Sequence, residues 1–381
     1  MAAQALGLYV HFPFCLSKCA YCDFPSQVTE RIPDPAYRDA VVEEIRTRAP
    51  EFGSGRFSTI FFGGGTPSLW SPDSVAAVID AARTTLGLAP DTEISLEANP
   101  GTIDTERLAA YRDAGVNRLS LGIQSLDDRL LSAVGRIHDR GQALRAVAAA
   151  RDAGLDNLGL DLIFGLPGQV PEAWVVDLGR ALTLAPEHLS LYQLTLAEGT
   201  PLRQAVDRGV RRVPDEDATA QMLEQGLALA ADAGYLRYEV SNLSRPDRRC
   251  RHNLIYWTGG EYLGVGAAAA SFRRVGIGLG ERVTNSSDPQ AYLCDRPGTA
   301  EREPLGPAEL IRERLLTGLR LCDGVDLDAL AAEIGSDPLA GKRDELDELI
   351  ELEMIEATAG RLRPTAEGLM FADALAERLS P

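Results

Sequence analysis

The sequence contains little cysteine and no long apolar run. It has 6 cysteines in 381 residues, three of them clustered near the start, which does not fit the dense disulfide framework of small secreted domains. No stretch approaches the roughly 20 apolar residues of a transmembrane helix, and no cationic segment leads into an apolar leader. We therefore expect a soluble cytoplasmic protein that contacts membranes only through a partner.

Basic residues are also in the minority. The chain has 38 Lys and Arg against 56 Asp and Glu, a net charge of −18. This balance argues against binding to nucleic acid or to an anionic membrane. The apolar content of 45% is sufficient for a large core, and the length suits a barrel of about 200 to 250 residues with a smaller appended domain.

Short apolar runs alternate with amphipathic stretches over the first 200 residues. The expected strands are Leu8–His11, Thr59–Phe62, Glu93–Glu97, Arg118–Leu121, Gly159–Ile163 and His188–Gln193. The expected helices are Ala36–Arg48, Pro72–Leu86, Asp104–Ala114, Arg140–Ala153 and Pro171–Leu184. Strands that alternate with helices favour a parallel sheet with right-handed crossovers. The pattern predicts an α/β fold, a partial (β/α)6 barrel.

The pattern changes after residue 200. A long helix is expected at Asp215–Ala233, followed by an aromatic and glycine-rich segment, Tyr235–Phe272. Further on, we expect helices at Ala308–Leu321, Leu327–Ile334 and Gly341–Leu352, a hairpin at Met354–Arg363 and a last helix from Thr365. Three helices and a hairpin resemble a small winged-helix-like domain. We expect a barrel in residues 1–200, an extension in 201–296 and a C-terminal helical domain in 297–381.

The most informative residues are three cysteines in the run HFPFCLSKCAYCDF. Cys15, Cys19 and Cys22 have the spacing C-x3-C-x2-C, one ligand short of the four thiolates that usually close a 4Fe-4S cluster. One iron would then keep a position open for a small molecule. A structural zinc site with His11 as the fourth ligand is the alternative. The spacing resembles the signature of the radical S-adenosylmethionine (SAM) superfamily, whose open iron binds SAM.

Polar or glycine-rich residues follow several of the expected strands. They are Gly64, Gly65 and Thr66 in FGGGTPS, Glu97 in SLEANP, Gln124 in LGIQSLDD and Asp161 in LGLDLIFGL. Glycines let backbone N–H groups approach a ligand, although a tight turn would explain the run as well. A carboxylate among apolar residues, such as Asp161, needs a polar partner, and Arg136 could supply one. In barrels, strand ends of this kind form one functional face.

Six runs together resemble the coproporphyrinogen dehydrogenase-like radical SAM family over almost the whole chain. They are YVHFPFCLSKCAYCDF, FGGGTPSLW, SLEANPGT, NRLSLGIQSLDD, DLIFGLPGQ and LYQLTLAEGTPL. The resemblance implies a radical SAM barrel with a small helical C-terminal domain, and a 4Fe-4S cluster on Cys15, Cys19 and Cys22. It also implies SAM contacts from Tyr9, Tyr21, Gly64, Gly65, Thr66, Glu97, Gln124, Arg136, Asp161 and Thr195.

Two departures point to one branch of that family. Phe24 stands where the dehydrogenases have a further cysteine, and Cys15 lies almost at the start of the sequence. Both features resemble the haem chaperone (HemW-like) branch, whose His-Asn-x-x-Tyr-Trp motif matches residues 252–257. The resemblance implies that His252 binds haem, with Cys250 as an alternative iron ligand, and that haem or porphyrin and haem-accepting proteins are the partners.

The expected function is therefore a haem chaperone with a SAM-ligated cluster. The alternative is a radical SAM enzyme, either similar to the oxygen-independent coproporphyrinogen III oxidase or a methyltransferase that uses two SAM molecules. Ala270 replaces a histidine found in the family, which leaves that alternative open. A zinc protein whose barrel binds a partner is the third possibility.

Overall fold

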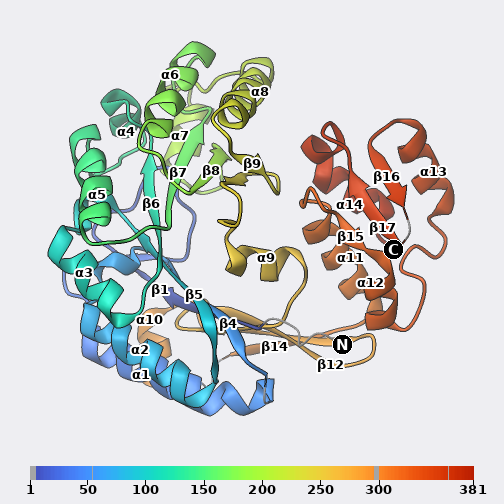
Figure 1. The fold of residues 1–381 in the computed structure, drawn as a ribbon, viewed down its shortest axis with the longest axis horizontal. Helices are drawn as coiled ribbons and strands as arrows, with labels where there is room; N and C mark the ends of the chain where they lie inside the picture. Colours follow the sequence, from blue (N-terminus) through green and yellow to red (C-terminus); the bar gives the residue numbers. More distant parts are fainter. Residues whose placement is uncertain (1–5, 54, 296–299, 359) are drawn as a thin grey trace.

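The computed structural model describes residues 6–53, 55–295, 300–358 and 360–381. A large α/β unit carries the chain as far as Leu305, and a smaller unit beside it carries the C-terminal part from Pro307 (Figure 1). Among the described residues, the large sheet has the strand order β14-β13-β12-β11-β1-β4-β5-β6-β7-β8-β10-β9. The C-terminus lies in the smaller unit (Figure 1).

Six adjacent parallel strands form the centre of this sheet. They are β1 (Leu6–Phe12), β4 (Phe57–Gly64), β5 (Leu88–Ala98), β6 (Arg118–Gln124), β7 (Leu158–Phe164) and β8 (His188–Gln193). Each contains one of the six expected strands, and they pair in sequence order. The prediction of a partial (β/α)6 barrel is confirmed.

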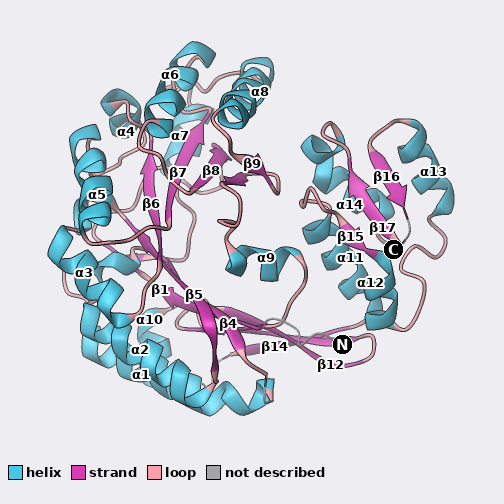
Figure 2. Ribbon diagram, viewed as in Figure 1, coloured by secondary structure: helices cyan, strands magenta, loops and turns pink. Residues whose placement is uncertain are grey.

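Helices cover the outer face of the strands (Figure 2). They are α1 (Asp34–Arg48), α2 (Pro72–Thr85), α3 (Thr105–Ala114), α4 (Asp128–Ala133), α5 (Arg140–Asp152), α6 (Pro171–Leu182), α7 (Pro201–Asp207) and α8 (Glu216–Asp232). Short 3-10 turns lie at η1 (Ala49–Phe52), η2 (Pro67–Leu69) and η3 (Pro100–Thr102). Side-chain caps fix several helix starts: Asp139 and Gln142 form a capping box on α5, which satisfies backbone N–H groups that the helix leaves unpaired.

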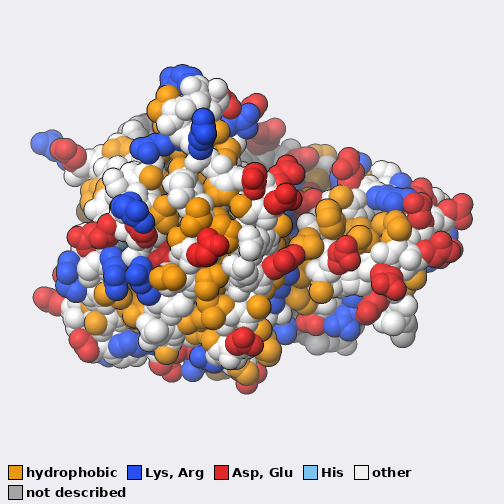
Figure 3. All heavy atoms as spheres, turned by 90° about the horizontal axis from the view of Figure 1, so that it is seen from above, with side chains coloured by type: hydrophobic (Ala, Val, Ile, Leu, Met, Phe, Trp, Pro, Cys, Tyr) orange, Lys and Arg blue, Asp and Glu red, His pale blue; other side chains and the backbone are white. Residues whose placement is uncertain are grey.

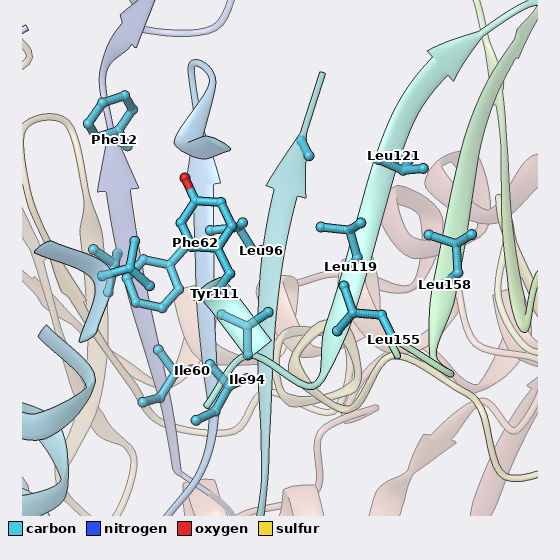
Figure 4. Packing of buried hydrophobic residues seen from close by; sticks show 14 of the residues in the cluster. Phe12, Ile60, Phe62, Ile94, Leu96, Tyr111, Leu119, Leu121, Leu155 and Leu158 are labelled. Carbon is cyan, nitrogen blue, oxygen red and sulfur yellow. The ribbon is translucent and has the colours of Figure 1, made fainter. Parts of the chain in front are cut away.

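The main core lies between the sheet and these helices. Phe12, Ile60, Phe62, Ile94 and Leu96 belong to one buried cluster, and their side chains lie along neighbouring strands (Figure 4). The core strands read as nearly continuous apolar runs because a parallel sheet covered by helices buries both faces. Removing this surface from water is the main force that holds the barrel together.

The segment after the barrel extends the sheet at both ends. Beyond β8 lie β10 (Asn242–Ser244) and β9 (Leu236–Arg237), and beyond β1 lie β11 (Tyr262–Val265), β12 (Ala270–Gly276), β13 (Leu279–Thr284) and β14 (Glu301–Leu305). The helices α9 (Arg251–Trp257) and α10 (Pro289–Asp295) connect these strands. The predicted division between residues 296 and 297 falls outside the described residues, and β14, which follows it, pairs with β13.

The C-terminal unit has a core of its own, which includes Leu315, Leu330 and Leu362. It comprises α11 (Pro307–Gly318), β15 (Val325–Asp326), α12 (Leu327–Ile334), α13 (Arg343–Glu351), β16 (Ile355–Thr358), β17 (Arg361–Pro364), η4 (Gly368–Phe371) and α14 (Ala372–Leu379). The three expected helices and the hairpin are present. The last helix begins at Ala372, not at Thr365 as predicted, because a short 3-10 turn precedes it.

Acidic side chains gather at the end of the molecule that this unit forms (Figure 3). Asp344, Asp347 and Glu348 of α13 are exposed there. This charge is opposite to that of a surface that binds nucleic acid. None of the helices in the described ranges combines the length and the apolar character needed to cross a bilayer.

The short elements β2 (Phe14–Cys15) and β3 (Gln27–Val28) pair in parallel on either side of the cysteine loop. Like α4, α7 and α9, they are too short to give a clear periodic signal in the sequence. These elements nevertheless shape the two ends of the barrel.

Candidate functional site

A cavity of about 550 Å³ opens at the carboxyl ends of the barrel strands. Residues from widely separated segments line it, and they include most of those singled out in the sequence. These are Cys15, Cys19, Tyr21, Cys22, Gly64, Gly65, Thr66, Glu97, Gln124, Arg136, Asp161 and Thr195. The chain therefore brings nine of the eleven predicted cofactor contacts and all three predicted cluster ligands to one place.

Backbone hydrogen bonds anchor the loop that carries the cysteines. The N–H of Cys22 donates to the carbonyl of Cys19 at 3.1 Å. Between them, the N–H of Ala20 donates to Val134 at 3.0 Å, and the carbonyl of Ala20 accepts from Leu202 at 2.8 Å. Burial raises the pKa of the Cys22 thiol. The loop after β6 and the start of α7 thus hold the cysteines over the cavity.

The glycine run packs closely against the strand that leads to Cys15. Gly65 N–H donates to the carbonyl of Phe12 at 2.8 Å, and Thr66 N–H donates to that of Phe14 at 2.9 Å. The Thr66 hydroxyl lies 3.5 Å from the sulfur of Cys15. A Cβ atom at position 65 would lie 2.7 Å from the Phe14 oxygen. Glycine is required at this position because the two backbones approach so closely.

Two carboxylates form another part of the cavity wall. Glu97 accepts the N–H of Gly64 at 3.2 Å, and burial, with a contribution from the nearby Asp161, raises the pKa of Glu97 to about 8. Asp161 accepts the Ser120 hydroxyl at 3.2 Å. Burial raises the pKa of Asp161 as well, although a hydrogen bond from Ser190 opposes the shift. Glu97 is therefore mainly protonated at neutral pH in the absence of a ligand.

Arg136 donates its hydrogen bonds to a predicted cluster ligand and to the backbone, and its charge opposes the rise in the pKa of Asp161. Its Nη1 atom donates to the sulfur of Cys19 at 3.4 Å, and Nη2 donates to the carbonyl of Gly122. Gln124 ends β6 with a positive φ of 60°. Such a backbone is strained for a residue other than glycine, and strain of this kind is common at functional sites.

The fourth ligand proposed for the zinc alternative, His11, is hydrogen-bonded to other groups. Both ring nitrogens of His11 are engaged: Nδ1 lies 3.1 Å from the Tyr9 hydroxyl, and Nε2 lies 3.0 Å from the carbonyl of Pro25. Three features fit a three-cysteine cluster with a bound organic ligand. They are the three thiols, the close backbone approach at Gly65, and the buried Nε atom of Arg136, which has no hydrogen-bond partner among the described residues. When bound, such a cluster and SAM supply one-electron chemistry.

Two of the predicted contacts, Tyr9 and His252, lie outside this cavity. His252 is 1% exposed and belongs to α9. Its Nδ1 atom is 2.7 Å from the Thr59 hydroxyl, and its Nε2 atom is 2.9 Å from the Tyr256 hydroxyl. Burial lowers the pKa of His252 to about 3, so the ring is neutral. Tyr9 stacks on this imidazole with ring centroids 6.3 Å apart.

The helix α9 closes the opposite, amino-terminal end of the barrel. Glu93, near the middle of β5, accepts the backbone N–H groups of Arg251 and His252, each at 3.1 Å. Cys250 is fully buried beside it, and burial raises the pKa of its thiol to about 12. Sequence reasoning missed Glu93 and Thr59, although a charged residue inside an apolar strand is a usable signal.

Comparison with known proteins agrees with this geometry. The Radical SAM superfamily domain matches residues 9–179, and the HemN C-terminal domain matches residues 305–371. The heme chaperone HemW of Escherichia coli K12 is 36% identical over 380 residues, which cover 98% of this chain and 97% of that protein. The heme chaperone HemW of Mycobacterium tuberculosis H37Rv is 35% identical, and the match covers 100% of this chain and 96% of that protein. This chain belongs to the HemW family of radical SAM proteins.

The family extends beyond bacteria. The mouse protein named radical S-adenosyl methionine domain-containing protein 1, mitochondrial, is 38% identical over 391 residues, 100% of this chain and 88% of that protein. Among solved structures, the radical SAM enzyme coproporphyrinogen III oxidase (HemN) from Escherichia coli has the same fold, with a TM-score of 0.83 at 24% identity. The superposition covers 99% of this chain and 90% of the HemN chain. Membership of the HemW family confirms the resemblance inferred from the sequence motifs.

Proposed function

We propose that this protein binds haem and passes it to haem-accepting proteins, and that it carries a 4Fe-4S cluster on Cys15, Cys19 and Cys22 with SAM at the open iron. Similarity to heme chaperone HemW proteins over 98% of the chain is the observation that carries the proposal. The convergence of the three cysteines with nine predicted SAM contacts in one cavity supports the cluster and the cofactor.

Phe24 supports the chaperone over the decarboxylating enzyme. It occupies the position of the additional cysteine of the dehydrogenases, lines the cavity and is 58% exposed. An exposed phenylalanine cannot replace a thiol in redox or acid–base chemistry, but it offers an apolar surface. Leu16, at 47% exposure, lies on the same cysteine loop. These side chains lie at the end of the barrel opposite His252, so the support that Phe24 gives to the chaperone is the missing thiol and not a place for haem.

His252 is the proposed haem ligand, and its surroundings set a condition on binding. A neutral imidazole is the form that coordinates iron, and burial holds His252 in that form. Both nitrogens are hydrogen-bonded in the structure, so iron ligation requires one bond to break and α9 to move. The buried thiol of Cys250 is the competing ligand, and its raised pKa disfavours the thiolate that iron prefers.

Haem titration of the cluster-loaded protein tests this function. We expect a Soret band typical of histidine ligation, a large loss of haem affinity in His252→Ala and little change in Cys250→Ser. Loaded protein should then transfer its haem to an apo-haemoprotein whose absorption reports uptake. A failure of the wild-type protein to bind haem contradicts the proposal, and a spectrum of thiolate ligation transfers the role to Cys250.

The second candidate is a radical SAM enzyme. The assembly of nine of the ten predicted SAM contacts around one cavity, beside the three cysteines, favours it. Anaerobic incubation with reductant, SAM and coproporphyrinogen separates the two functions. We expect no protoporphyrinogen at multiple turnovers, and its detection would favour the enzyme.

The site of action is proposed to be the cytoplasm. Three closely spaced cysteines bind a cluster only as free thiols, and a reducing compartment maintains them in this state. The acceptors would be haemoproteins, and contact with a membrane would then occur only through such a partner.

A further inference from the structure

A second, smaller cavity of about 150 Å³ lies among the barrel strands. Polar side chains make up most of its wall, and they include Arg118, Ser120, His188, Ser190 and Asn253. A cavity of this volume has room for a molecule of about six heavy atoms. The small cavity can therefore hold a small polar group, but neither a nucleoside nor a porphyrin fits inside it.

Arg118 brings a buried positive charge to this cavity. The residue is 2% exposed, and its Nε atom is buried with no hydrogen-bond partner among the described residues. A guanidinium stays charged at every ordinary pH and has N–H donors but no acceptor. Burying such a charge is costly unless it is paired and hydrogen-bonded. The cavity wall therefore presents a cation that a ligand with acceptor atoms would stabilise.

A second unsatisfied group lies beside Arg118. Nε2 of His188 is 2.8 Å from the Tyr238 hydroxyl, which accepts the N–H of Cys250 at 3.4 Å. The hydroxyl hydrogen is then available to Nε2, so the ring hydrogen of the neutral imidazole is on Nδ1. This Nδ1 atom is buried without a partner among the described residues. A Cβ atom at Gly159 would lie 3.3 Å from Nη2 of Arg118 and 3.5 Å from Nδ1 of His188. The two donors therefore flank one point.

Nearby acids limit the charge that a ligand can carry. Glu97 and Asp161 line the cavity; Glu97 is mainly protonated because burial raises its pKa to about 8, and Asp161 accepts the Ser120 hydroxyl at 3.2 Å. Glu93, which also lies near Arg118, accepts two backbone N–H groups at the start of α9. These acids would repel a phosphate with two charges. A single carboxylate matches the planar fork of one guanidinium.

We propose that the small cavity binds one carboxylate group on Arg118 and His188. The carboxylate belongs to a short free acid or to an arm of a larger ligand, because Glu97 and Asp161 line both the small cavity and the cofactor cavity. It is not the carboxylate of SAM, since SAM is proposed to bind at the open iron beside the cysteines. The inference goes beyond the proposed function and does not require haem to bind at His252.

Acetate and its neutral isostere acetamide test the site on wild-type protein. Saturation-transfer NMR measures the binding of each to cluster-loaded protein with SAM present, at an ionic strength held constant with sodium chloride. We expect saturable binding of acetate and none of acetamide, because only the carboxylate pairs with a guanidinium. Equal binding of the two molecules overturns the proposal. Displacement of acetate by an equal concentration of chloride shows a general anion site and overturns the carboxylate assignment.

The variant Arg118→Lys tests the residue. It keeps a buried charge but loses the fork, so acetate affinity should fall roughly tenfold. Arg48→Lys is the matched control, because Arg48 is also buried, at 4% exposure, but pairs with Glu44 at 3.3 Å outside this cavity. It should bind acetate as the wild type does. An unchanged acetate affinity in Arg118→Lys overturns the assignment, and the acetamide comparison still tests the site if this variant does not fold.

Haem and haem dimethyl ester test the second source of the carboxylate. A preference of the wild-type protein for haem over the ester, lost in Arg118→Lys, identifies a propionate arm, whereas acetate binding without that preference identifies a free acid. If acetate does not bind and haem is not preferred to its ester, the proposal is overturned. Acetate binding by protein that takes up no haem contradicts the proposed function alone.

Discussion

The guanidinium of Arg136 donates a hydrogen bond to the sulfur of Cys19 across 3.4 Å. The two residues are 117 positions apart in the chain, and each was singled out in the sequence for a separate reason. Their contact joins the predicted cluster ligands to the predicted SAM contacts. A positive charge beside the sulfur of a cluster also favours the reduced form of that cluster.

Replacing Arg136 tests this link. Arg136→Gln should still assemble a cluster, because the three thiols remain, but its reduction potential should become more negative. SAM affinity should fall by about 1.5–3 kcal/mol if the guanidinium holds the SAM carboxylate. Redox titration followed by electron paramagnetic resonance and SAM binding measure the two effects. Arg129→Gln, on the exposed surface of α4, should leave both unchanged, and an unaltered potential in Arg136→Gln would contradict the role.

The cysteine assignment makes a second prediction. Cys19→Ser should lose most of the iron that wild-type protein takes up on anaerobic reconstitution, about four atoms per chain. Cys294→Ser is the control, since Cys294 is exposed on α10 far from this loop in the sequence, and it should retain a full cluster. Iron and sulfide analysis gives the answer. A full cluster in Cys19→Ser would refute the assignment.

The third prediction concerns Gly65. Its added Cβ atom would lie 2.7 Å from the Phe14 oxygen and 3.0 Å from the Phe12 oxygen. Because these atoms belong to the backbone that leads to Cys15, Gly65→Ala should reduce cluster content together with SAM affinity. Gly179→Ala is the matched control, as nothing lies near its Cβ position in α6. Loss of SAM binding with a full cluster would show that Gly65 serves only as a SAM cradle.

Glu97 gives a prediction for pH. Its pKa is about 8 in the folded, SAM-free protein and near its ordinary value of about 4.3 when unfolded. Between these values the unfolded chain ionises and the folded one does not. The stability contribution of Glu97, fully present below its ordinary pKa, is therefore lost as the pH rises toward 8.

Glu97→Gln removes this ionisation. The free energy of unfolding, measured with denaturant from pH 5 to 8, should fall less steeply with pH in this variant than in the wild type. Glu106→Gln, an exposed carboxylate on α3, serves as the control and should reproduce the wild-type slope. Equal slopes for all three proteins would show that Glu97 is already ionised at neutral pH.

The sequence was sufficient to predict the barrel and most of the residues that line the cavity at the carboxyl ends of its strands. The six strands and their helices could be predicted because apolar runs alternate with amphipathic stretches along the sequence. A strand buried on both faces is apolar throughout, so a short run of the sequence is enough to identify it. Cys15, Glu97 and Asp161 could be placed at one end because the carboxyl ends of parallel strands share an edge. The cysteine spacing alone left two alternatives, an iron–sulfur cluster and a zinc site. The resemblance of the motifs to a known family is what favoured the cluster and SAM.

Only the tertiary structure decided the surroundings of His252. In the sequence it lies in an arginine-rich run and could be a surface residue, whereas the fold buries it between Thr59 and Tyr256. Thr59 is 193 positions away in the chain, and no periodic pattern encodes a contact at that separation. The small cavity beside Arg118, His188 and Asn253 likewise exists only because strands β4 to β8 and α9 come together around it. Local sequence sets which segments become strands and helices, but side-chain partners at long range are set by packing.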